Sequence, residues 1–82
     1  MTWLYTILKP YCERKGIRLL HDDFKFIERC LSQIHQNLHR SVMRDYVRLY
    51  LSWLAEGEKT PQTQNLARRQ ANNWLREYCF QE

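Results

Sequence analysis

The 82-residue chain contains few residues that interrupt regular structure, with only two glycines and two prolines. Loops that cradle phosphate groups are usually rich in glycine, so the sequence excludes a nucleotide-binding loop of that kind. It is also poor in the features of disordered chains, because 44% of its residues are hydrophobic and 13% are aromatic. A chain of this length forms one hydrophobic core. We therefore expect a single folded domain over residues 1–82.

Long apolar runs are absent as well. An uncharged, mainly apolar stretch runs from Trp3 to Leu8, and it is far short of the roughly 20 residues that a membrane-spanning helix needs. No basic residues precede it as they do in a signal peptide. We expect a soluble, cytoplasmic protein without a membrane partner.

The three cysteines, Cys12, Cys30 and Cys79, include no Cys-x-x-Cys pair. Each lies on or beside an apolar stripe, which favours reduced thiols in the core over disulfides.

Apolar residues recur with the period of an α-helix in four segments, and no segment alternates as a strand would. The first is predicted to start after an N-cap at Thr2 and to stop at Gly16, with a kink or break at Pro10. The second is predicted to follow an N-cap at Asp22 or Asp23. Its apolar side is formed by Phe24, Ile27, Cys30, Leu31 and Ile34.

The third segment is predicted to run from an N-cap at Ser41 to Glu56. Its apolar residues cover more than half of the helix circumference, which only a centrally packed helix can bury. They are Val42, Met43, Tyr46, Val47, Leu49, Tyr50, Leu51, Trp53 and Leu54. The fold class is therefore expected to be all-α, a compact four-helix domain built around this third helix.

The fourth segment is predicted to begin with Thr60 as N-cap and Pro61 in the first turn, and to reach about Cys79. Its expected core stripe consists of Ala67, Ala71, Trp74, Leu75 and Tyr78. The opposite arc contains arginine and amide side chains and no carboxylate: Gln62, Asn65, Arg68, Arg69, Asn72, Asn73 and Arg76.

This arc is the main functional prediction from the sequence. Residues 59–76 hold four basic side chains and no acid. Arginine binds phosphate through a planar fork of donors, and asparagine can pair with adenine edges. We therefore expect a small, non-enzymatic binding protein that contacts the phosphates of DNA or RNA through Arg68, Arg69 and Arg76. Amide hydrogen bonds are expected from Asn65, Asn72 and Asn73.

A second basic strip, Arg40, Arg44 and Arg48, runs at spacings of four residues along the third helix. Arg44 and Arg48 extend the predicted nucleic-acid site if they lie on the same side as the fourth helix. The alternative is that one of them pairs with Glu28.

The other functional hypothesis is a protein-interaction module, an inhibitor or adaptor such as phages and mobile elements encode, or a homodimer. Its partner would be an acidic protein surface, and its expected apolar anchors are Tyr50, Leu51, Leu66 and Phe80.

Metal binding and catalysis have weaker support in the sequence. Cys30, His35 and His39 are too few for a structural zinc site, which needs four ligands, and the histidines are expected at the surface. Cys12 or Cys30 with His21 lies in no reactive-site motif. We expect no cofactor, no metal and no enzymatic activity.

Overall fold

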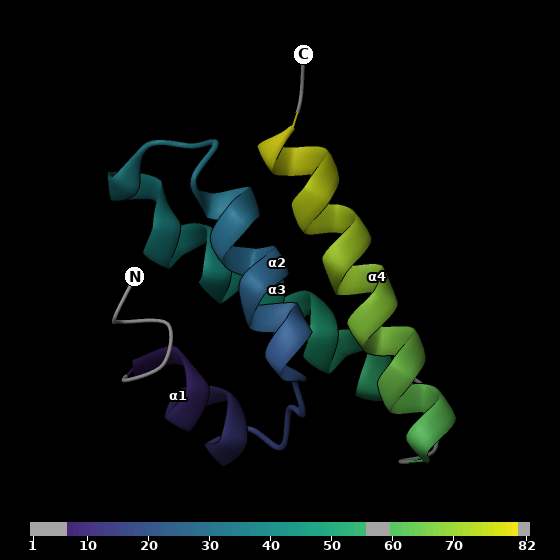
Figure 1. The fold of residues 1–82 in the computed structure, drawn as a ribbon. Helices are drawn as coiled ribbons and strands as arrows, with labels where there is room; N and C mark the ends of the chain where they lie inside the picture. The colour runs from purple at the N-terminus through teal and green to yellow at the C-terminus, as the bar shows by residue number, and fades with distance from the viewer. Residues whose placement is uncertain (1–6, 56–59, 81–82) are drawn as a thin grey trace.

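The computed structural model describes residues 7–55 and 60–80, and every regular element among them is helical. The elements are α1 (Lys9–Arg14), α2 (His21–Leu31), the 3₁₀ helix η2 (Gln36–Leu38), α3 (His39–Ala55) and α4 (Pro61–Cys79). The all-α prediction is confirmed. In Figure 1, α2 lies in front of α3, while α1 and α4 occupy opposite flanks. Within the described ranges, no helix has the length and apolar character needed to cross a membrane.

Helix α1 carries Pro10 in its first turn. The amides of a first turn have no intrahelical partner, so proline costs no hydrogen bond there. The predicted start of this helix, from Thr2, lies outside the described residues. Gly16 ends the segment as expected, with a φ of 76°.

The starts of α2 and α3 differ from the predictions. Helix α2 starts at His21, so neither Asp22 nor Asp23 is its N-cap. Instead, the carboxylate of Asp23 in the first turn accepts the Leu20 N–H at 2.7 Å. Helix α3 starts at His39, directly after η2, so Ser41 is not its N-cap. The Ser41 hydroxyl instead donates to the Leu38 carbonyl at 3.1 Å.

The end of α2 also differs, because the helix stops at Leu31 and does not reach Ile34. The next turn continues through single hydrogen bonds from Gln33 to Cys30 and from Ile34 to Leu31.

Helix α4 has the predicted bounds, with the Thr60 hydroxyl accepting the Thr63 N–H at 3.2 Å. Its core stripe differs at one end, where Tyr78 is 40% exposed and Cys79 is buried in its place.

Helix α3 is the centre of the core. It contributes Val42, Met43, Tyr46, Val47, Tyr50 and Leu54 to the buried cluster and packs most extensively against α4. The small, fully buried Ala67 and Ala71 of α4 let the two backbones approach closely. Tyr50, which the sequence placed both on the apolar side of this helix and among the possible anchors, is completely buried, so the second prediction is wrong. Its hydroxyl donates to the Gln64 Oε1 at 2.8 Å and lies 3.2 Å from the Arg18 carbonyl.

We expect Gly16→Ala to lower the free energy of unfolding by about 1 kcal/mol, the cost of a left-handed backbone conformation for an L-residue. No atom lies within 4 Å of the added Cβ, so the loss reports backbone strain alone. Gly16→Asn should cost less, because asparagine tolerates this conformation better. Urea denaturation of both variants measures the difference, and equal losses would contradict this explanation.

Candidate nucleic-acid interface

The predicted binding arc of α4 is divided by its contact with α2. Asn65, Arg69 and Arg76 are exposed, whereas Arg68 and Asn72 are half-buried on the side that faces α2. Successive residues of a helix point about 100° apart, so neighbours in the sequence have different environments. The arc is therefore not one uniform surface.

The buried carboxylate of Asp23 on α2 is the reason for this division. Asp23 is 6% exposed and accepts hydrogen bonds from Arg68 and Asn72, each at 3.1 Å. Its ion pair with Arg68 is partly shielded from water, because the arginine side chain is only 27% exposed. No carboxylate lies among the predicted residues themselves, but α2 supplies one.

A third helix joins the same network through Tyr46 of α3. The Tyr46 hydroxyl donates to the Asn72 Oδ1, while the amide of Asn72 donates to Asp23. Burial raises the pKa of Tyr46 above its ordinary value, and the Asp23 charge adds to this effect. The tyrosine thus remains a neutral donor, and Asn72 is oriented by partners at both ends of its amide group.

The side chains that remain available form a stripe along α4. Asn65, Arg69, Asn73 and Arg76 recur at spacings of four, four and three residues, which places them on one face. The Asn73 Oδ1 accepts a hydrogen bond from the Arg76 guanidinium at 3.1 Å. Arg69 has no carboxylate partner within the described ranges. These four side chains can donate hydrogen bonds to an anionic ligand.

Two further arginines lie at the edge of this stripe, and the sequence did not single them out. Arg18 precedes α2 and lines a surface pocket of about 410 Å³ together with Asn65 and Arg68. Arg29 on α2 and Arg76 on α4 both lie near the Cys30 thiol. Neither position has a sequence signal, because Arg18 is in the irregular connection before α2 and Arg29 is on the ordinary polar side of an amphipathic helix.

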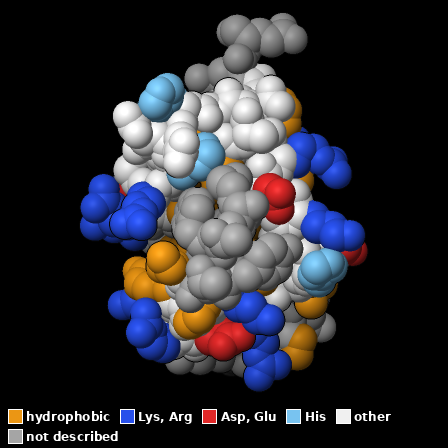
Figure 2. Space-filling model, turned by 60° about the vertical axis from the view of Figure 1, so that its left-hand side comes forward, with side chains coloured by type: hydrophobic (Ala, Val, Ile, Leu, Met, Phe, Trp, Pro, Cys, Tyr) orange, Lys and Arg blue, Asp and Glu red, His pale blue; other side chains and the backbone are white. Residues whose placement is uncertain are grey.

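The second basic strip belongs to a different part of the molecule. Arg40 and Arg44 line a pocket with residues of α1, on the flank away from α4 (Figure 1). Figure 2 turns the α1 flank toward the viewer and shows exposed hydrophobic side chains at its left, with basic side chains above and below them. Arg48 is exposed on α3. The structure therefore separates Arg44 from the face of α4.

The histidines considered as metal ligands are engaged in local hydrogen bonds. His39, expected at the surface, is buried with its Nε2 2.7 Å from the Leu31 carbonyl oxygen. His35 uses its Nδ1 to accept the Asn37 N–H at 3.1 Å. In the described part of the chain, no three His, Cys, Asp or Glu residues come together in a group able to hold a metal.

The thiols are buried and reduced, as the sequence predicted. Burial raises the pKa of Cys12 to about 11, with a smaller contribution from Glu13. Burial also raises the pKa of Cys30 to about 11, against the opposing charges of Arg29 and Arg76. A thiol with such a pKa is protonated at neutral pH and is a poor nucleophile.

Comparisons of the chain with models of known protein families, with curated proteins and with solved structures found no match. A functional assignment therefore rests on the chemistry of the surfaces described above.

We expect Asp23→Asn and Arg68→Ala each to lower the free energy of unfolding by about 1–3 kcal/mol, because each removes a charged partner from a buried network. The double variant should lose less than the sum of the two, since both changes act on one interaction. Arg69→Ala, one residue away and exposed, is the matched control and should leave stability unchanged. Additive losses in urea denaturation would show that the two residues act independently.

We expect the three thiols of the native protein to resist an aromatic disulfide reagent at neutral pH and to react completely in urea. The folded-state pKa of Cys12 and Cys30 is raised, so their contribution to stability is present below the unfolded thiol pKa of about 8.5. It is lost as the pH rises from there toward about 11. Rapid labelling of any thiol in the native protein would contradict their burial.

Proposed function

We propose that the protein binds nucleic acid through a stripe of α4 with Arg18 and Arg29 at its edge. The stripe is formed by the exposed Asn65, Arg69 and Arg76 and the half-buried Asn73. The observation that supports this most strongly is that one arginine of α4 is held in an ion pair while two others are exposed to solvent. Arg68 is held by Asp23, which fixes how α4 is turned about its axis. Arg69 and Arg76 remain exposed, without a carboxylate partner in the described part of the structure.

The dimensions of α4 suit this role. A helix with its side chains is roughly 10–12 Å wide, close to the roughly 12 Å width of the DNA major groove. Arg69 and Arg76 are seven residues apart, which corresponds to about 10 Å along the axis. Two guanidinium groups at that separation can contact different phosphates, while the amide of Asn73 between them can reach a base edge.

Phosphate contacts of this kind supply affinity by releasing counterions from the nucleic acid. Arg18 precedes α2 and Arg29 lies in its last turn, so they can contact the nucleic-acid backbone on one side of α4. The exposed donors are mostly charged, which predicts binding that depends on salt more than on sequence.

The test is binding of a fluorescent 20-base-pair DNA and an RNA of equal length across a salt series. We expect Arg69→Ala/Arg76→Ala to abolish binding at physiological salt. At low salt, the slope of log affinity against log salt should fall by about 2, one for each lost phosphate contact. Arg44→Ala/Arg48→Ala is the matched control, with the same change in net charge on α3. Arg68 is left intact, because its loss would disturb folding.

Equal losses in both double variants would assign binding to net charge and not to the α4 stripe. Affinity that does not change between low and physiological salt would overturn the proposal for both nucleic acids.

A protein partner is the second candidate, because Leu66 of α4 and Phe80 directly after the helix are 41% and 44% exposed. Binding through these apolar side chains would be less sensitive to salt. A pull-down with and without nuclease separates the two, since retained partners after nuclease favour protein binding. A homodimer is tested by light scattering, where a constant monomer mass across concentrations excludes it.

A further inference from the structure

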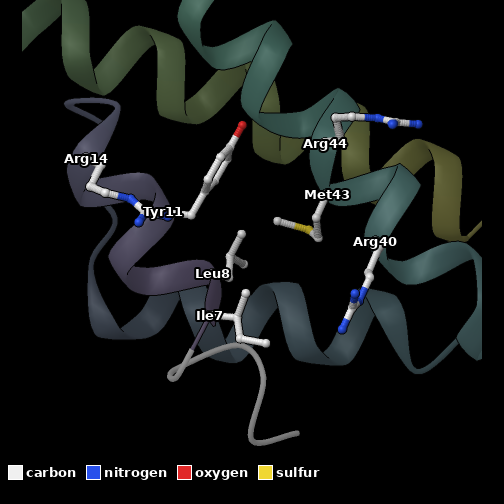
Figure 3. A pocket seen from close by; sticks show the side chains of 7 residues that line it. All are labelled: Ile7, Leu8, Tyr11, Arg14, Arg40, Met43 and Arg44. Atoms are coloured by element: carbon white, nitrogen blue, oxygen red, sulfur yellow. The ribbon is translucent and has the colours of Figure 1, made fainter.

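A pocket of about 310 Å³ lies between α1 and α3, apart from the α4 stripe. Figure 3 shows hydrophobic side chains from α1, from the two residues before it and from α3 meeting at its centre. They are Ile7, Leu8, Tyr11 and Met43. The rim is formed by three arginines, Arg14 from α1 and Arg40 and Arg44 from α3.

The floor of this pocket is partly open to solvent. Leu8 and Met43 are almost fully buried at 4% and 2% exposed, but Ile7 beside them is 54% exposed. An apolar site of this kind gains free energy when an apolar side chain covers it. The floor therefore suits an anchor residue of a ligand.

The arginines stand on two sides of that floor. In Figure 3, Arg14 lies on one side, next to Tyr11, while Arg40 and Arg44 lie on the other. None of the three guanidinium groups is in an ion pair with a carboxylate of the described residues. The ligand that complements this surface has an apolar centre with negative charge on both sides.

We propose that this pocket binds an acidic segment of a partner protein, in which an apolar side chain enters between α1 and α3. Carboxylates on either side of that side chain pair with Arg14 and with Arg40 and Arg44. A fatty acid has one charged group and satisfies only one side of the rim. A nucleic-acid backbone supplies the charges but leaves the apolar floor uncovered.

The experiment starts from a random peptide library displayed against the immobilised full chain. The two most enriched peptides are then synthesised, and their affinities are measured by fluorescence anisotropy. Binding is compared for the original chain, Arg40→Ala/Arg44→Ala, Ile7→Ser and the matched control Arg69→Ala/Arg76→Ala. All substituted side chains are exposed, and circular dichroism checks that each variant is folded.

We expect the enriched peptides to carry a large apolar residue flanked by Asp or Glu. Both pocket variants should bind them about tenfold more weakly, the loss expected for a charge pair or an anchor in such a site. The control variant should bind normally, which keeps the outcome independent of nucleic-acid binding through α4.

Three results would overturn the proposal. The first is a selection without enrichment, or with enriched peptides that lack the acidic and apolar pattern. The second is unchanged affinity in both pocket variants. The third is binding of dodecanoate as tight as that of the peptides, because it would show that the two-sided rim is not used.

Discussion

The carboxylate of Asp23 holds three helices in register. It closes the first turn of α2 by accepting the Leu20 N–H, holds α4 through Arg68 and Asn72, and reaches α3 through the Asn72–Tyr46 hydrogen bond. A buried carboxylate is costly unless it is paired and hydrogen-bonded, so these contacts are required together. Because they fix the rotation of α4, they also decide which of its arginines face solvent.

The sequence predicts the helices well where local signals are strong and poorly where a neighbouring helix decides the outcome. Thr60 and Pro61 mark the start of α4 without reference to the rest of the chain, and the predicted start is confirmed. Asp23 looks like a local cap in the sequence, and it does accept the Leu20 N–H, but its contacts with Arg68 and Asn72 depend on α4. Arg68 and Arg69 are the same residue type and adjacent in the sequence. Only the position of α2 pairs Arg68 with Asp23 and leaves Arg69 exposed.

The hydrogen-bond partners of buried tyrosine and histidine side chains were likewise beyond sequence reasoning. Tyr50 and His39 have polar atoms that favour exposure when considered alone. The structure buries them because the carbonyl of Leu31 lies near the His39 ring and Gln64 near the Tyr50 hydroxyl. Such partners come from positions 8 and 14 residues away, a distance at which residue spacing carries no information about contact. The pocket between α1 and α3 was missed for the same reason.

The small residues Ala67 and Ala71 have a consequence for how the surface of this protein can change during evolution. They set the distance between α4 and its neighbours, and Arg69, Asn73 and Arg76 are carried on the same helix. A larger residue at either position would move the whole stripe relative to Arg18, which precedes α2, and Arg29, which lies on α2. Selection can therefore adjust the spacing of surface charges through residues that no ligand ever touches.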